Sequence, residues 1–236
     1  MKAQDSTVSY KRSLIIGMLL GDSSSRLRKT ESGKLKAEFT VCHSLKQVDL
    51  VRWKAVEINR LFAANVVVKE YDTYNKAVFS ITKSRRIRVV HSWFHRSGKK
   101  VITDKIRFMD HPVGMAMLLC DDGSVRKRKK KHKDGTEYYL APSITIATHS
   151  FSKDEVERLL HHLEKLCGAH GYINPERRVR RGKKVEYHRI NFNAENSRIL
   201  WHYVSPWIPK VPSMISKFSF VIERYGINQS NQTVSI

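Results

Sequence analysis

Two aspartates, about 100 residues apart, each follow a short apolar run. Residues 14–21 precede Asp22, and residues 115–120 precede Asp121 and Asp122. Each run is long enough for a buried helix and too short to cross a membrane. A carboxylate at the end of such a helix lies among unpaired carbonyl oxygens, at the negative end of the dipole, which costs about 0.3–1 kcal/mol. The two runs therefore place acidic groups where a counter-ion is needed.

A divalent cation between the two acidic ends would remove this cost, because carboxylate and carbonyl oxygens suit magnesium or calcium. The helices must then pack side by side. Gly17 and Gly21 are four residues apart, as are Ala116 and Cys120, so each pair of small residues lies on one helical face and allows a close approach. The alternative is two ordinary core helices that each end at a solvated aspartate.

The chain repeats one order of elements twice, at a period near 100 residues. In the first half we expect a helix that begins at residues 6–9 and ends at 21, followed by a hairpin turn at Gly33 and a strand at 37–43. A Ser44–Gln47 capping box then opens a second helix, which ends at Phe62. Strands at 66–70 and 77–82 and a helix at 85–94 complete this half. In the second half we expect a hairpin over 126–133 that turns at 134–135, a strand at 143–149, a helix opened by a Ser152–Glu155 capping box, a hairpin within 177–192, and a helix at 195–204.

This order predicts an α+β fold of two pseudo-symmetric α-β-β-α-β-β-α subdomains, like a fused two-fold dimer with the apolar helices on its axis. We expect the subdomains to be residues 1–98 and residues 99–236, the second with a linker at its start and a C-terminal tail.

The net charge of +22 and the isoelectric point of about 10.1 imply a polyanionic partner, nucleic acid before an anionic membrane. The three cysteines lack CxxC spacing, which fits free thiols in a reducing compartment. The N-terminus does not resemble a secretory signal. We therefore expect an intracellular protein with no membrane partner, in the cytoplasm or nucleoid or in an organelle such as a mitochondrion or chloroplast.

The paired runs resemble the two signature helices of the LAGLIDADG homing endonucleases, in the form that carries both copies on one chain. In that family the eighth position of the motif is the metal-binding catalytic aspartate, and it falls on Asp22 and Asp122. Position nine of the first copy is Ser23 in place of glycine, and position seven of the second is Asp121 in place of a small residue. The Asp-Asp-Gly ending is similar to the second motif of intron-encoded single-chain members. The resemblance covers residues 8–220.

The resemblance implies two or three Mg²⁺ ions, with Mn²⁺ or Ca²⁺ able to substitute in binding. The expected metal ligands are Asp22, Asp122, Gly21 and Asp121. The family also places a lysine near each active site, and the segments that resemble its surroundings contain Lys100 and Lys217. Each lysine would polarise a water or stabilise negative charge, so the expected catalytic groups are the two motif aspartates and these two lysines. The alternative is a surface role, and Lys99 and Lys210 are the nearest substitutes.

Two basic runs lie where hairpins are expected: residues 126–133 hold seven Lys or Arg in eight positions, and residues 177–184 hold six. A two-stranded ribbon fits the major groove of DNA, and in the resemblance the antiparallel sheets of both halves form a saddle along the duplex. A solvated loop or a localisation signal is the alternative. The candidates for DNA contact are Arg26, Arg28, Lys36, Lys69, Lys76, Arg126, Arg128, Arg180, Lys184 and Arg189.

The resemblance thus implies a monomeric, magnesium-dependent homing endonuclease that recognises a long asymmetric duplex site and cuts both strands, leaving short 3′ overhangs. Two alternatives stay open on the sequence. One is a maturase of the same fold that binds intron RNA, and the other is a DNA-binding protein that does not cut.

Overall fold

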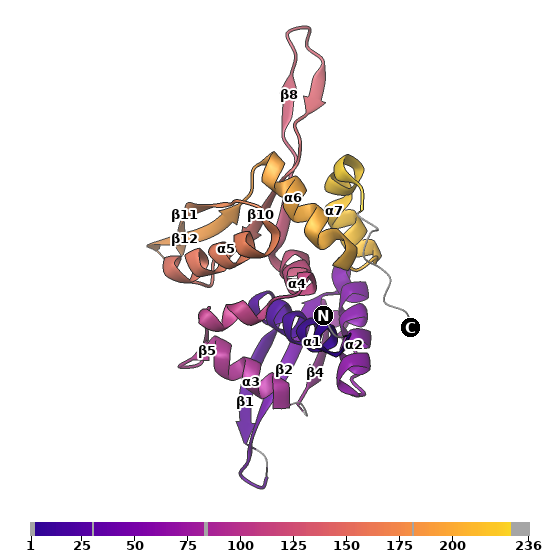
Figure 1. Cartoon of the computed structure of the whole chain (residues 1–236), viewed down its shortest axis with the longest axis vertical. Helices are drawn as coiled ribbons and strands as arrows, with labels where there is room; N and C mark the ends of the chain where they lie inside the picture. The colour runs from indigo at the N-terminus through magenta and orange to yellow at the C-terminus, as the bar shows by residue number, and fades with distance from the viewer. Residues whose placement is uncertain (1–2, 30, 83–84, 181, 228–236) are drawn as a thin grey trace.

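The computed structural model describes residues 3–29, 31–82, 85–180 and 182–227. Helices α1 (Ala3–Leu20) and α4 (Pro112–Asp122) lie side by side at the centre, between two halves that each contain one four-stranded antiparallel sheet (Figure 1). The last seven residues of α1 (14–20) and residues 113–120 of α4 are apolar on all sides of the helix and almost all fully buried. A helix that is apolar all round must be enclosed, and here each half covers one side of the pair.

The first half has the expected order of elements, with the bounds α1, β1 (Ser24–Lys29), β2 (Leu35–Ser44), α2 (Val48–Phe62), β3 (Lys69–Tyr71), β4 (Lys76–Ile81) and α3 (Arg85–Phe94). Its sheet has the strand order β1-β2-β4-β3. Gly33, with φ of 73°, lies in the turn between β1 and β2, where a positive φ favours glycine. Phe39, Val41 and Phe79 are buried on the face of this sheet that packs against the helices.

The second half repeats this order as α4, β7 (Gly123–Arg126), β10 (Ser143–Ala147), α5 (Lys153–Cys167), β11 (Tyr172–Arg180), β12 (Lys183–Asn191) and α6 (Ala194–Val204). Its sheet has the strand order β11-β12-β10-β7. The Ser152–Glu155 capping box is present, with both reciprocal hydrogen bonds formed. The prediction of two α-β-β-α-β-β-α halves in an α+β fold is confirmed.

The hairpin expected over residues 126–133, with its turn at 134–135, is present as an arm separate from the four-stranded sheet, and two further elements, a short hairpin and a C-terminal helix, were not expected from the sequence. Strands β8 (Lys129–Lys131) and β9 (Glu137–Tyr139) form a separate two-stranded arm that projects beyond the second half (Figure 1). The short hairpin β5 (His95–Arg96) and β6 (Lys99–Lys100) leads from the first half into α4, and the expected subdomain boundary at residue 98 falls in its turn. Helix α7 (Pro212–Tyr225) packs against α6 and α2, and residues 228–236 of the expected tail lie outside the described residues.

The first capping box was predicted wrongly. Ser44 precedes a short 3₁₀ turn, Leu45–Gln47, and its side chain makes no capping hydrogen bond. The side chain of Gln47 turns back to His43, with Gln47 Oε1 at 3.2 Å from His43 Nδ1. A side-chain contact with His43, four residues earlier in the chain, has therefore replaced the expected cap, and α2 begins at Val48. None of the helices in the described ranges is long and apolar enough to cross a membrane.

Candidate active site

The C-terminal ends of α1 and α4 meet at the junction of the two halves. The closest point is at Gly21, where a side-chain Cβ would lie 2.5 Å from Asp121 Oδ2, so only glycine fits there. The same Asp121 oxygen accepts a hydrogen bond of 3.2 Å from the backbone N–H of Asp22. The carboxylate of Asp22 is about half exposed, whereas that of Asp121 is fully buried. The acidic groups expected from the sequence are therefore brought together across the helix pair.

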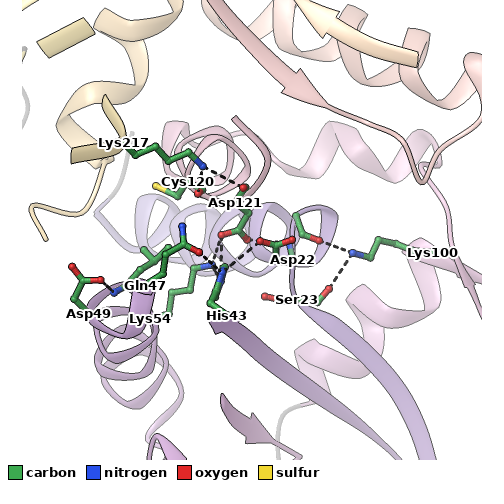
Figure 2. A network of polar contacts seen from close by, with 12 residues as sticks. Asp22, Ser23, His43, Gln47, Asp49, Lys54, Lys100, Cys120, Asp121 and Lys217 are labelled. Atoms are coloured by element: carbon green, nitrogen blue, oxygen red, sulfur yellow. Dashed lines mark hydrogen bonds and ion pairs between the residues drawn. The ribbon is translucent and has the colours of Figure 1, made fainter. Parts of the chain in front are cut away.

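Lys100 and Lys217 occupy equivalent places beside the two helix ends (Figure 2). Lys100 Nζ, from β6, donates to the carbonyl oxygens of Gly21 and Ser23 at 2.6 and 3.0 Å. Lys217 Nζ, from α7, donates to the carbonyl oxygens of Cys120 and Asp121 at 2.6 and 3.2 Å. A cation is favourable at the negative end of a helix dipole. Each half thus supplies one ammonium group to the end of its own central helix.

Burial dominates the electrostatics of these groups. Burial, together with the neighbouring charges of Asp22 and Asp121, raises the pKa of Asp122 to about 7, while Lys100 and Lys217 act in the opposite direction. Burial also lowers the pKa of both lysines, against the pull of the nearby carboxylates. Three carboxylates at one site favour a cation among them, because each would otherwise raise the cost of ionising the others.

The sequence did not indicate two residues that the fold brings to this site, Lys54 and His43. Lys54 Nζ donates to Asp121 Oδ1 at 2.5 Å and lies 3.0 Å from His43 Nε2 (Figure 2). His43 Nδ1 lies 3.5 Å from Asp22 Oδ2. The one available signal is that Lys54 occupies an apolar position in the helical repeat of α2, between the buried Val51 and Ile58. A fully buried lysine requires a charged partner, but the pattern does not say which.

The donor set fits a divalent cation at the acidic ends. Asp22, His43 and Asp121 present ligand atoms within 4.8 Å of one another. The Asp121 carboxylate already neutralises the buried ammonium group of Lys54. Among the described residues, neither Asp22 nor Asp122 forms an ion pair of this kind with a lysine, so their two carboxylates are available to a cation. Carboxylates and carbonyls are the oxygen ligands that magnesium and calcium prefer. The carbonyls of Gly21 and Asp121 keep a second lone pair beyond the bond to each lysine.

The DNA-contact candidates of the first half share one face of its sheet. Pairs that are directly opposite in an antiparallel sheet lie on the same face, and Arg28 pairs with Lys36 while Lys76 pairs with Tyr71. This is the face opposite the buried Phe39 and Val41, and it carries Arg26, Arg28, Lys36, Lys69 and Lys76. Glu38 lies between Arg26 and Arg28 and forms ion pairs with both guanidinium groups.

The candidates of the second half are more dispersed. Arg126 pairs with Ser143 on the outer face of the sheet, and Arg189 lies on the same face, where it forms an ion pair with Glu176. The exposed Lys184 lies on the opposite face of β12, because strand residues alternate. The exposed Arg128 lies at the base of the arm, where its carbonyl accepts from the N–H of Leu140 at 2.9 Å. The side chain of Arg180 lies outside the described part of the chain.

The sequence profile of the LAGLIDADG DNA endonuclease family matches residues 12–216, which include the buried part of α1, all of α4, both four-stranded sheets and Lys100, and the match ends one residue before Lys217. The chain belongs to the LAGLIDADG DNA endonuclease family. A search of curated protein sequences finds no significant match.

Solved structures of LAGLIDADG homing endonucleases share the fold. I-WcaI bound to its DNA recognition sequence is 19% identical, with 89% of this chain and 85% of that chain covered and a TM-score of 0.55. I-DmoI in complex with DNA and Ca is 12% identical, with 89% of this chain and 97% of that chain covered and a TM-score of 0.55. I-SmaMI bound to uncleaved DNA in the presence of calcium is 13% identical, with 82% and 84% covered and a TM-score of 0.51. At these identities the likeness shows the fold alone.

Proposed function

We propose that this protein is a monomeric homing endonuclease that recognises a long asymmetric duplex site and hydrolyses both strands in a magnesium-dependent reaction, leaving short 3′ overhangs. The observation that carries the proposal is the joint end of α1 and α4, where motif carboxylates from both halves and two buried lysines lie together. A protein that only binds DNA has no need to hold so many ionisable groups in a buried site at the cost of their desolvation.

Asp22 and Asp122 would hold the divalent cations, helped by the carbonyl oxygens of Gly21 and Asp121. Bound magnesium would supply an activated water and relieve the charge on the phosphate and leaving oxygens. Lys100 and Lys217 hold ammonium groups beside the two helix ends, where they stabilise negative charge that develops on the reacting phosphate. Burial lowers the pKa of both lysines, which also suits them to exchange a proton with water.

Duplex DNA would lie along the outer faces of both sheets. The β1–β2 hairpin and the β8–β9 arm project at opposite ends of the long axis of the molecule, which supports a long binding site (Figure 1). The two halves differ, because only the second has an arm in the described ranges. A long and asymmetric site follows from this difference, and the net charge of +22 supplies the attraction to phosphate.

The test is incubation of the protein with a duplex that spans a candidate insertion site, with and without Mg²⁺. We expect double-strand breaks at one position that require the metal, and binding without cleavage in Ca²⁺. Binding of the duplex without cleavage under all metal conditions would contradict the proposal. Selective binding of structured intron RNA over duplex DNA would also contradict it and favour a maturase.

A further inference from the structure

Lys54 is a lysine in the apolar core. Its side chain has no exposed surface, and its neighbours on the buried face of α2 are Leu50, Val51 and Ile58. Burying an ammonium group is costly unless it is paired and hydrogen-bonded. The Asp121 carboxylate meets this need, because its Oδ1 accepts from Lys54 at 2.5 Å and it is equally buried. A residue of the first half is thus paired with the central helix of the second.

This pair determines how the imidazole of His43 is oriented. An ammonium group can only donate a hydrogen bond, so Nε2 of His43, 3.0 Å from Lys54 Nζ, must accept. The proton of a neutral imidazole then resides on Nδ1. That atom faces two acceptors, Gln47 Oε1 at 3.2 Å and Asp22 Oδ2 at 3.5 Å.

The arrangement has no equivalent in the second half. The place of His43 at the end of β2 corresponds to that of His149 after β10, and His149 instead faces Glu176, with its Nε2 at 3.3 Å from Glu176 Oε2. The offset that relates these two histidines also relates Lys54 to Leu160, an apolar residue. Asp121 corresponds to Gly21, which has no side chain. Leu160 and Gly21 therefore cannot perform the parts of Lys54 and Asp121, and His149 is paired with a carboxylate in place of a lysine.

We propose that Lys54 and Asp121 are positioning residues that fix His43 as an N–H donor beside Asp22. The two cleavage centres are then unequal, and cleavage of one DNA strand depends on His43 while cleavage of the other does not. This inference rests on the proposed endonuclease function. It also assigns the side chain of Asp121 to Lys54 and not to a metal ion, since a carboxylate that neutralises a buried ammonium group contributes little charge to a cation.

The main experiment measures the cleavage of each strand separately. The probe is a duplex selected by binding in Ca²⁺ from a randomised pool, with a different 5′ dye on each strand, and single-turnover cleavage is started with Mg²⁺. We expect His43→Ala to slow one strand at least tenfold and the other less than twofold, so that a nicked duplex accumulates. His149→Ala is the matched control, and it should leave the ratio of the two strand rates unchanged. Equal slowing of both strands by His43→Ala, or no slowing of either, would overturn the proposal.

A second pair of variants separates positioning from stability. Lys54→Met leaves the charge of Asp121 buried without a partner and should lower Tm. Lys54→Met/Asp121→Asn contains no such charge, so we expect Tm to recover while the strand ratio remains altered as in His43→Ala. Recovery of both the Tm and the wild-type strand ratio would show that the pair is structural only.

A third measurement does not depend on cleavage. In ¹⁵N NMR spectra of the free protein, the imidazole of His43 should be neutral with its proton on Nδ1, and the double variant should lose this fixed tautomer. An Nε2–H tautomer in the wild-type protein would overturn the positioning role. If the wild-type protein cleaves neither strand, the endonuclease proposal fails, and the NMR result decides the role of Lys54 and Asp121 separately.

Discussion

Gly17 of α1 lies directly against the carbonyl group of Gly114 of α4, and a side-chain Cβ on Gly17 would overlap that carbonyl. On the α4 side, a Cβ on Gly114 would lie 2.8 Å from the carbonyl oxygen of Ser13. The spacing of small residues correctly indicated a close approach at Gly17 and Gly21. On the second helix, Gly114 lies against α1 in the same way, and Asp121 is the residue nearest to Gly21.

We expect Gly17→Ala to destabilise the protein by about 1–3 kcal/mol or more, because backbone atoms on both sides must move to admit the methyl group. Chemical denaturation of the variant and the wild type measures this difference. Glu31→Ala in the exposed β1–β2 turn serves as the control and should change the free energy of unfolding by less than about 0.5 kcal/mol. A Gly17→Ala protein as stable as the wild type would show that the helices are not in contact there.

Asp22→Asn and Asp122→Asn should each lower double-strand cleavage by about two orders of magnitude or more while leaving DNA binding largely intact. Each substitution keeps the shape of the side chain and removes its charge, so a cation is held less well. Cleavage in Mg²⁺ and binding in Ca²⁺ are measured on the same duplex. Asp104→Asn, at an exposed surface aspartate, is the control. Wild-type cutting by either motif variant would contradict the assigned site.

Lys100→Met and Lys217→Met should each slow cleavage by about 10²–10³-fold, because each removes a charge that is already in place beside the reacting phosphate. Binding should change little. Lys99→Met and Lys210→Met are matched controls, since these neighbours were the substitutes that the sequence left open. If Lys99→Met or Lys210→Met loses activity while Lys100→Met or Lys217→Met does not, the catalytic role has been assigned to the wrong lysine.

The arm should contribute affinity on one flank of the target only. Replacing residues 129–139 by Asn-Gly should be tolerated, because Arg128 and Leu140 are already hydrogen-bonded across the base of the arm. The change removes Lys129, Lys130, Lys131 and Lys133, so the slope of log K against log salt should fall by up to about 4. Binding between 50 and 200 mM salt, together with footprinting, tests this. Lys153→Ala/Lys165→Ala on α5 is the control, and a footprint shortened at both ends would contradict the prediction.

Acid should weaken the fold through two stacked histidines. His91 and His95 lie with ring centroids 4.2 Å apart. Burial, with a contribution from His91, lowers the pKa of His95 to about 4. Between about pH 6.5, the usual pKa of an unfolded histidine, and pH 4, the unfolded state binds more protons, so the free energy of unfolding falls as the pH is lowered. Since the ring is only partly buried, we expect a loss on the order of 1 kcal/mol.

Denaturation at several pH values between 4 and 7 measures this slope. His95→Phe keeps an aromatic ring in the stack and should flatten the slope across the window. His132→Gln, at an exposed position in the arm, is the matched control and should retain the wild-type slope. An unchanged slope in His95→Phe would assign the acid sensitivity to other groups.

The sequence by itself determined the duplication, the order of elements in each half and the two central helices with their acidic ends, whereas the two lysines were expected from the resemblance to the family. Apolar periodicity, turn residues and a repeated motif are local patterns, and local patterns are sufficient to identify such features. The same reasoning placed the basic residues of β1–β4 on one strand face, because alternation in a strand has a period of two.

Only the tertiary structure decided the roles that depend on contacts between distant segments. A lysine in an apolar helix repeat is ambiguous until its partner is known, and the partner of Lys54 is Asp121, on the other half of the chain. The same applies to His43, which the fold places between Lys54 and Asp22. These contacts form because desolvated polar groups must pair within the core, and the fold alone determines which ones can meet.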